Sequence, residues 1–455
     1  NNIFEEKFWE LYMLEEKYTI YQINKMKTTI NNICLIGSFI ALTVNAQEVT
    51  TIAGSGVAGI INANGSAAAF KNAHDVAVAA DGSIYVADQG NHMIRKIDAN
   101  GDVTSYAGAG TVGSADGTLT TATFNNPTGV CFNSTGEMFV ADYSNNKIRK
   151  IDLQGNVTTF AGSGQSASFD ATGTIASFNG PVGICVDQDD NIYVAEQVGH
   201  VIRKITPSQV VTTVAGSAGF SGSIDANSNV ARFNAPYDVV SDMNGNLYVA
   251  DQNNHKIRKI DATGNVTTVA GDPFNASGHM DDNGPNATFY FPLSVDVDQD
   301  GNIYVGDYGN HSIRKIDTNG DVTTVSGNYG GQGDVDGPAA SARFNYLTGI
   351  CMDNDGNIII ADYGNNKIKK LDFNLANISS INNESTLVLS PNPVKNTLTI
   401  NAHTSIRDIT IVTVTGEKVL STKQSIFDVS HLNNGVYFAR IITDKGTETI
   451  KFIKN

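Results

Sequence analysis

The sequence predicts an all-β protein: a six-bladed β-propeller of four-stranded antiparallel blades, followed by a small β-sandwich. Three observations lead to this fold class. The 455 residues include 44 glycines and a single tryptophan, and short runs of Val, Ile, Thr and Tyr alternate with turn residues, as in all-β proteins. A Tyr-Val-Ala-Asp phrase or a close variant recurs six times. One strand-like segment precedes the first repeat and is missing after the last.

The repeat sets the number of blades. Its acidic residue recurs every 54 to 56 positions, at Asp88, Asp142, Glu196, Asp251, Asp307 and Asp362. A period of this kind indicates one supersecondary unit per repeat, and four-stranded units arranged radially form a propeller. The unit at 233–271 predicts strands at 238–241, 246–250, 256–260 and 265–270. The turns between them carry Asn-Gly, Asp-Gly or Thr-Gly, whose glycines supply the positive φ that hairpins need.

The first extended segment is predicted to close the ring. Segments similar to Val-Thr-Thr-Val-Ala-Gly occur at 49–54, 103–108, 157–162, 211–216, 266–271 and 322–327. The sixth unit ends at 371–373 without such a segment. Residues 49–54 should therefore form the outer strand of the sixth blade and remove an exposed sheet edge. A linear solenoid, which needs no such exchange, is the alternative.

The ends of the chain predict export. Residues 26–46 combine Lys27, an apolar run at 33–44 and a small-residue cleavage site before Gln47, which together indicate a signal peptide. The run is shorter than the roughly 20 residues that a membrane span requires; a membrane anchor and a buried helix are the alternatives. Residues 1–25 are interpreted as an upstream extension outside the fold.

The rest of the chain divides into three parts. We expect the propeller at 47–373, a linker rich in Asn and Ser at 374–385, and a β-sandwich of at most about seven short strands at 386–455.

Three motifs in the last part carry a family resemblance: Pro391-Asn392-Pro393, Gly435-Val436-Tyr437 and the ending Lys451-Phe452-Ile453-Lys454. The segment resembles the C-terminal sorting domain of the type IX secretion system. This resemblance implies a Gram-negative host, passage through the periplasm, recognition of 386–455 by the type IX machinery, and a product that is secreted or held on the outer-membrane surface. A retained adhesive sandwich is the alternative.

The repeat phrase Ile-Tyr-Val-Ala-Asp-x-x-Asn-His-x-Ile-Arg-Lys resembles the NHL repeat family, over 47–373. The resemblance implies a propeller but leaves the activity open, because NHL propellers include binding modules, lyases and relatives of lactonases.

Net charge limits the classes of partner, and cysteine placement predicts the absence of disulfides. The formal net charge of −16 is spread along the chain, so the protein should repel phosphate backbones, and nucleic acid is excluded as a partner. Cys34 lies in the predicted signal peptide. Cys131, Cys185 and Cys351 occupy one repeat position on different blades, and we expect inner strands of adjacent blades to be farther apart than the about 7 Å that a disulfide allows. They are expected to be buried free thiols.

Residues that recur in most blades are interpreted as architecture. The acid of each repeat should pair across strands with an arginine, at Arg95, Arg149, Arg203, Arg258 and Arg314. Histidines recur at His92, His200, His255 and His311, with Asn146 and Asn366 at the same position in the other blades. Because they recur at one repeat position, these histidines are predicted to be structural. A metal cluster is the alternative, since imidazole is the commonest neutral metal ligand.

Residues that break the repeat are the candidate ligand site. Only blades one and four place a carboxylate beside a ring before the inner strand, at His74-Asp75 and Tyr237-Asp238. Asp296 stands where other blades carry small apolar residues. At the channel mouth, these groups suit a cation or an acid/base pair. Local turn capping and solvation by internal water are the alternatives.

A rim of flat side chains follows the repeat phrase. Tyr143, Tyr308 and Tyr363 occupy this position in three blades and glutamines occupy it in the other three, a combination that suits sugars or peptides. Ordinary loop packing is the alternative.

The sequence favours a binding or scaffold module for glycan or protein ligands on the loop-rich face. No P-loop, Gly-x-Ser-x-Gly, His-Glu-x-x-His or EF-hand motif occurs, so no catalytic residue, metal ligand or cofactor is assigned. The alternative is a metal-dependent propeller enzyme, a lactonase-like hydrolase or a lyase. It would hold Ca or Zn through His74, Asp75, Tyr237, Asp238 and Asp296.

Overall fold

The computed structural model describes residues 47–373 and 387–455, with gaps at 403–404, 414–417 and 444–445. The predicted extension, signal peptide and linker lie outside the described residues. The described residues fall into two units, one before and one after the linker region.

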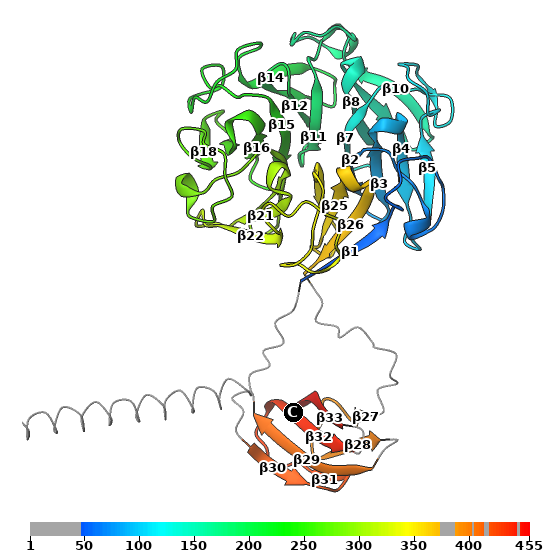
Figure 1. Cartoon of the computed structure of the whole chain (residues 1–455), viewed down its shortest axis with the longest axis vertical. Coiled ribbons are helices and arrows are strands. Elements are labelled where there is room, and N and C mark those ends of the chain that lie inside the picture. Colours follow the sequence, from blue (N-terminus) through cyan, green and yellow to red (C-terminus); the bar gives the residue numbers. More distant parts are fainter. Residues whose placement is uncertain (1–46, 374–386, 403–404, 414–417, 444–445) are drawn as a thin grey trace, which may run out of the picture. The chain divides into compact units, whose positions relative to one another are not determined.

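The first unit consists of six antiparallel sheets arranged around an axis (Figure 1). The innermost strands are β2 (Ala73–Val78), β7 (Pro127–Phe132), β11 (Pro181–Val186), β15 (Pro236–Ser241), β19 (Pro292–Val297) and β24 (Gly349–Met352). The second strands are β3 (Ile84–Asp88), β8 (Met138–Asp142), β12 (Ile192–Glu196), β16 (Leu247–Asp251), β20 (Ile303–Asp307) and β25 (Ile358–Asp362). The third strands are β4 (Met93–Ile97), β9 (Lys147–Ile151), β13 (Val201–Ile205), β17 (Lys256–Ile260), β21 (Ser312–Ile316) and β26 (Lys367–Asp372).

The fourth strands complete the blades. They are β5 (Val103–Ala107), β10 (Asn156–Ala161), β14 (Val211–Gly216), β18 (Val266–Ala270), β22 (Val322–Gly327) and, for the sixth blade, β1 (Glu48–Ala53). Two short strands, β6 (Gly117–Thr118) and β23 (Gly337–Pro338), extend blades two and six at their outer edges. We number the blades by their inner strands, from blade one (β2) to blade six (β24).

The first strand joins the last blade, as the sequence predicts. β1 runs antiparallel to β26, with Val49 opposite Leu371 and Thr51 opposite Lys369. Each inner strand contacts the next around the axis, and β24 contacts β2. In Figure 1 the blue β1 lies beside the gold β26. The outer edge of β26 is thereby paired, and the ring closes.

Short 3-10 turns connect the strands. Those between second and third strands are η2 (Gln89–Asn91), η3 (Tyr143–Asn145), η5 (Gln252–Asn254), η7 (Tyr308–Asn310) and η8 (Tyr363–Asn365). Those in the connections between blades are η1 (Gly65–Ala67), η4 (Gly173–Ile175) and η6 (Gly284–Asn286). No helix of the described residues has the length and apolar character that a membrane crossing requires.

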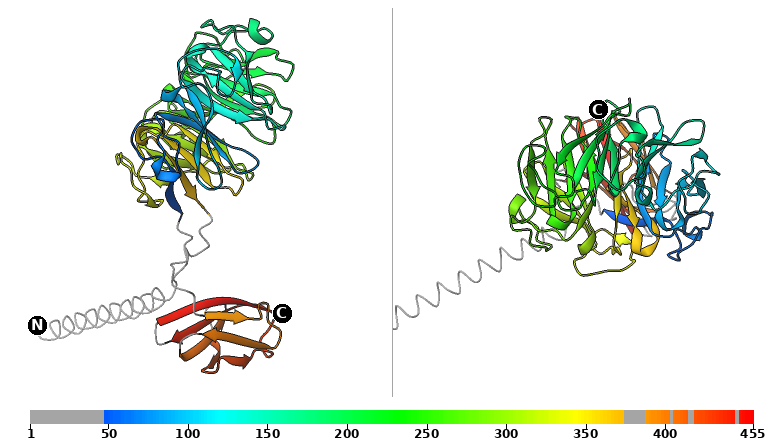
Figure 2. Two further views of the ribbon diagram at one scale, coloured as in Figure 1. Left: turned by 90° about the vertical axis from the view of Figure 1, so that its right-hand side faces the viewer. Right: turned by 90° about the horizontal axis from the view of Figure 1, so that it is seen from above.

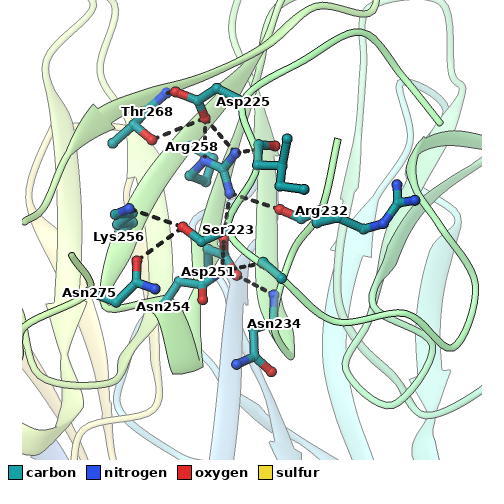
Figure 3. A network of polar contacts seen from close by, with 12 residues as sticks. Ser223, Asp225, Arg232, Asn234, Asp251, Asn254, Lys256, Arg258, Thr268 and Asn275 are labelled. Carbon is teal, nitrogen blue, oxygen red and sulfur yellow. Dashed lines mark hydrogen bonds and ion pairs between the residues drawn. The ribbon is translucent and has the colours of Figure 1, made fainter. Parts of the chain in front are cut away.

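A buried arginine anchors each of blades one to five. In blade four, Arg258 Nη1 lies 2.7 Å from Asp251 Oδ2, and Nη2 lies 2.5 Å from Asp225 Oδ1 (Figure 3). The guanidinium also donates to the carbonyl oxygen of Arg232, at 3.1 Å, and lies 5.2 Å from the centroid of the Phe233 ring. The predicted pairing is therefore present, and it ties the second and third strands to the connection before the blade.

Blade six uses a lysine at the same place. Lys369 Nζ lies 3.5 Å from Asp362, 2.8 Å from Asp334 and 3.0 Å from Asp336. Lys369 thus has three carboxylate partners, where Arg258 has two. The additional carboxylate compensates for the loss of the planar, two-pronged guanidinium group, because an ammonium group binds as a point charge.

The second unit has seven described strands in two sheets, in agreement with the predicted small sandwich (Figure 2). One sheet contains β27 (Leu387–Ser390), β28 (Thr397–Ala402) and β31 (Ile426–Asp428). The other contains β29 (Ile406–Thr413), β30 (Lys418–Thr422), β32 (Gly435–Thr443) and β33 (Gly446–Lys454). Leu398 and Phe427 of the first sheet share a core with Ile411 and Phe452 of the second.

Candidate functional site

The inner strands meet around the axis, and residues near their starts enclose a small hollow. It is lined by His74, Asp75, Thr128, Gly129, Val182, Gly183, Tyr237, Asp238, Leu293 and Thr348. The centre of a water molecule has about 10 Å³ to move in, which is room for about one water. Four predicted site residues, those of blades one and four, thus meet here. Asp296 lies further along β19 and still acts electrostatically on Asp75 and Asp238.

His74 and Tyr237 face each other across the axis. His74 Nε2 lies 2.6 Å from the Tyr237 hydroxyl, and Nδ1 lies 3.3 Å from the carbonyl oxygen of Thr128. Because that carbonyl only accepts, we assign the proton to Nδ1, which leaves Nε2 to accept from the tyrosine. Burial lowers the pKa of His74 to about 4. The imidazole is therefore neutral at neutral pH.

The three axial carboxylates bind backbone N–H groups of neighbouring blades. Asp75 Oδ2 accepts from Val130 at 3.0 Å, and Asp238 Oδ2 accepts from Val295 at 3.0 Å. Asp296 Oδ2 accepts from the N–H of the next inner strand, β24, at 2.7 Å. These bonds join adjacent inner strands. Asp238 and Asp296 also accept through Oδ1 from the N–H of the next residue, at 2.8 Å, so local capping is present as well.

The carboxylates are held where ionisation is disfavoured. Burial raises the pKa of Asp75 to about 7 and that of Asp296 to about 6, and it also raises the pKa of Asp238. Their oxygens are engaged with backbone donors, which compete with a cation. Among the described residues, no group of three His, Cys, Asp or Glu side chains is placed to hold a metal ion. Cys131, Cys185 and Cys351 are free thiols.

The predicted rim converges above this hollow. Tyr143 donates a hydrogen bond to Gln197 Oε1 at 3.3 Å, and Gln197 Nε2 donates to Gln252 Oε1 at 3.1 Å. Tyr363 contacts His74 edge to face, with ring centroids 6.2 Å apart. Burial raises the pKa of Tyr237, and the nearby hydroxyls of Tyr363, Tyr143 and Tyr308 add to this rise. The three predicted rim tyrosines therefore lie near Tyr237.

Sequence reasoning missed three aromatic residues that extend this rim, Tyr290, Phe291 and Tyr346, and the last two share an unusual backbone conformation. Before each inner strand, one residue adopts positive φ: Asn72, Asn126, Gly180, Ala235, Phe291 and Tyr346, at 51° to 67°. Asn and Gly tolerate this left-handed conformation, whereas for a residue with a bulky side chain it costs roughly 1–2 kcal/mol. Such strain is most often found at functional sites. The available signal was the Phe-Asn-x-Pro motif, which becomes Phe-Tyr-Phe-Pro in blade five and Phe-Asn-Tyr-Leu in blade six.

These two residues belong to two aromatic pairs in blades five and six, Tyr290 with Phe291 and Tyr308 with Tyr346, which together we call the aromatic patch. Ring centroids are 4.8 Å apart in each pair. Tyr290 packs on Gly309, the residue after Tyr308, where an added Cβ would lie 2.5 Å from its ring. Tyr290 and Tyr346 are 40% and 37% exposed.

Comparison with known families agrees with the two resemblances. A model described as "Secretion system C-terminal sorting domain" matches residues 389–455. The NHL repeat model matches residues 289–316 and 344–371. The chain is an NHL-repeat propeller with a C-terminal secretion sorting domain. A further model, "SMP-30/Gluconolactonase/LRE-like region", matches residues 2–217.

Relatives of this NHL propeller are longer proteins. NHL repeat-containing protein 2 of Bos taurus is 28% identical over 332 residues, which is 65% of this chain and 46% of the relative. Protein SUPPRESSOR OF QUENCHING 1, chloroplastic, of Arabidopsis thaliana is 28% identical over 296 residues, or 61% of this chain and 28% of the relative. The chain thus spans less than half the length of these relatives.

Solved structures share the fold of the NHL propeller. An auxiliary nutrient binding protein from Bacteroides thetaiotaomicron has a TM-score of 0.55 at 17% identity, covering 72% of this chain and 76% of its own. One from Bacteroides ovatus also has a TM-score of 0.55, at 19% identity with the same coverage.

The sorting domain directs the NHL propeller through the type IX secretion system to the cell surface or the extracellular space.

The repeated histidines join adjacent blades of the NHL propeller. In four blades the Nδ1 atom accepts from a backbone N–H of the following connection at 3.0 to 3.1 Å: His92 from Asn126, His200 from Ala235, His255 from Phe291 and His311 from Tyr346. Asn146 and Asn366 accept in the same way at the other two junctions. The interpretation of these histidines as structural agrees with this geometry.

These junctions make stability depend on pH. Burial lowers the pKa of all four histidines below the ordinary 6.5. The unfolded chain therefore binds protons first, so their contribution is complete above pH 6.5 and is lost as pH falls through the lowered values. Changing all four histidines to asparagine, as found in blades two and six, should flatten this decline. Urea unfolding at pH 7.5, 6.5 and 5.5 measures it.

The comparison with wild type isolates the histidines. Asp75 and Asp296 act in the opposite direction, since their raised pKa values favour the folded state as pH falls, but both proteins contain them. His279, which stacks on Tyr329 outside the blade junctions, provides the control variant His279→Asn. Equal pH profiles for wild type and the fourfold variant would contradict the expectation.

Proposed function

We propose that the exported propeller is a non-catalytic binding module whose ligand docks on the face that carries the tyrosine and glutamine rim. The observation that supports this most is the difference between the axis, where the polar groups already have hydrogen-bond partners, and the rim, where side chains are half-exposed. The axial carboxylates are bonded to backbone N–H groups across blade junctions, and the hollow has room for about one water. The rings and amides above it are half-exposed. Side chains of this kind contribute most to ligand contact areas.

The metal-dependent enzyme is not favoured by the described residues. Catalysis of that kind needs ligands that are free to bind a cation and an open position for the substrate. The three axial carboxylates have backbone partners and raised pKa values. Two Bacteroides proteins with this fold are named auxiliary nutrient binding proteins, so the fold is compatible with a binding role.

The route of export is also a proposal in its details. We propose a signal peptide at 26–46, a linker at 374–385 and a sorting domain that begins near 386 and is recognised by the type IX machinery of a Gram-negative cell. The match to the sorting-domain family over 389–455 supports this division.

The binding proposal is tested with the full chain on combined glycan and peptide arrays. We expect binding to at least one ligand class, and about a tenfold loss or more when Tyr143 and Tyr363 are both changed to alanine, because aromatic contacts contribute on the order of 1 kcal/mol each. Met243→Ala is the control: Met243 is exposed and lies in the β15–β16 turn, at the opposite end of the blade from the rim.

Two results would overturn the proposal. One is array binding that is unchanged in the double tyrosine variant. The other is a stoichiometric, chelator-sensitive Ca or Zn together with lactone hydrolysis or lyase activity, which would establish the enzyme instead.

A further inference from the structure

We propose that the aromatic patch of blades five and six binds an uncharged carbohydrate. This inference rests on the proposed binding function and specifies its ligand class and its place on the rim. The first argument is asymmetry. Blades one to four have Asn72, Asn126, Gly180 and Ala235 at the position of positive φ, whereas blades five and six have Phe291 and Tyr346. The chain accepts a strained aromatic residue at two adjacent blades, where an asparagine satisfies the fold elsewhere.

The second argument is the geometry of the rings. The Tyr308 and Tyr346 rings are inclined by 33°, and those of Tyr290 and Phe291 by 31°. At centroid distances of 4.8 Å the two rings of each pair overlap, and Tyr290 and Tyr346 remain 40% and 37% exposed. Exposed aromatic rings match the C–H faces of pyranose rings, which are apolar, while hydroxyl and amide groups beside them bind the sugar hydroxyls. Asn345 lies next to Tyr346 in the chain, and its side chain packs on Gly364 of η8.

The platform is rigid as well as exposed. Backbone N–H groups of Phe291 and Tyr346 donate to the Nδ1 atoms of His255 and His311, at 3.1 and 3.0 Å. The same histidine rings contact the two aromatic rings at centroid distances of 4.7 and 4.5 Å. The N–H of Tyr290 donates to the buried Asp307 at 2.8 Å. Binding therefore does not require these loops to be ordered first, which favours a ligand that contributes only weak contacts.

The third argument is charge. In the described part of the chain, the cations that lie over aromatic rings do so at interior phenylalanines and at the tyrosines of the second strands, such as Tyr248 and Tyr304, and none lies over the patch. The two imidazoles below the patch accept hydrogen bonds and are neutral. A chain with a net charge of −16 also repels acidic polymers. An anionic glycan is therefore disfavoured, and so is an acidic peptide.

The test uses affinity electrophoresis of the full chain in gels containing mannan, dextran, xylan or mixed-linkage β-glucan, with polygalacturonate as the anionic comparison. We expect retardation by at least one neutral polysaccharide and none by polygalacturonate. Phe291→Asn and Tyr346→Asn install the residue that blades one and two use. Each variant should weaken binding about fivefold, by removal of one stacking ring that contributes on the order of 1 kcal/mol.

Folding is controlled by the same substitutions. Asparagine tolerates the left-handed conformation better than an aromatic ring, so the unfolding midpoint of both variants should stay the same or rise. Loss of binding then reflects the ring itself. Met243→Ala serves as the surface control.

Three outcomes would overturn the carbohydrate assignment: no retardation by any of the four neutral polysaccharides, retardation by polygalacturonate alone, or retardation that both asparagine variants retain. The proposed binding function fails separately. If the arrays show a peptide ligand that is lost in the Tyr143 and Tyr363 double variant, the binding module stands and only the carbohydrate is wrong. If neither gels nor arrays show a ligand, both proposals fail.

Discussion

Changing Arg258 to alanine should lower the free energy of unfolding of the propeller by about 3–5 kcal/mol, because it leaves a buried carboxylate without its counter-charge. Asp251 is fully buried, and its Oδ2 atom accepts from Arg258 at 2.7 Å. Burial already raises the pKa of Asp251, and Arg258 offsets part of that rise. The substitution also removes donors from the carbonyl oxygens of Arg232 and Ile224. Urea unfolding monitored by far-UV circular dichroism measures the loss of unfolding free energy.

The adjacent cation supplies the control. Lys259 lies 5.8 Å from the centroid of Tyr248 and is partly exposed, so Lys259→Ala should change stability by about 1 kcal/mol or less. A loss for Arg258→Ala no larger than this would show that the buried pair does not anchor the blade.

Blade six indicates how to rescue the variant. Ser223 and Asp225 occupy the places that Asp334 and Asp336 hold beside Lys369. Arg258→Lys alone should therefore be only partly tolerated, and Arg258→Lys with Ser223→Asp should recover stability by recreating the blade-six arrangement. A double variant no more stable than the single lysine variant would contradict this account.

Changing Val49 to aspartate should also be strongly destabilising. We expect the free energy of unfolding to fall by several kcal/mol, because an unpaired charge would be placed in the core. Val49 is fully buried and packs with Leu371 and Ile358 of blade six. Its strand supplies the outer pairing of β26. Hydrogen exchange followed by mass spectrometry should show faster exchange in β1 and β26, with the middle blades affected less.

The neighbouring residue provides a matched comparison. Thr50 is exposed on the same strand, and Thr50→Asp introduces the same charge without burial. We expect a change of about 0.5 kcal/mol or less. If the two variants lost similar amounts of unfolding free energy, the destabilisation would come from a charge anywhere on β1 and not from burial of the charge.

Much of the fold could be predicted because it depends on local features. The acidic residue every 54 to 56 positions and the glycine-containing turns define each meander. The missing strand after 371–373 reveals the ring closure. Asp251 and Arg258 recur together in nearly every unit, so their pairing was also predictable.

The candidate site was less predictable because it depends on contacts between units. A register shift occurs between Ala73 and Asp75 where the inner strand begins, and the carboxylate then reaches the N–H of Val130 in the next blade. Sequence alone gives neither the shift nor the distant donor. Phe291 and Tyr346 stand out only when the left-handed backbone at their position is known, since an irregular residue in a loop carries no such information by itself.

The strand that closes the ring is made first, and the edge it must seal is made last. Val49 finds its partner Leu371 only after every intervening blade has been synthesised, and pairings between such distant parts of a chain form slowly. Any product cut short before 373 therefore keeps an unsealed edge and a stranded first segment. A product that reaches residue 373 can pair β1 with β26, whereas a shorter product keeps an open sheet edge, which is a site for pairing with other chains.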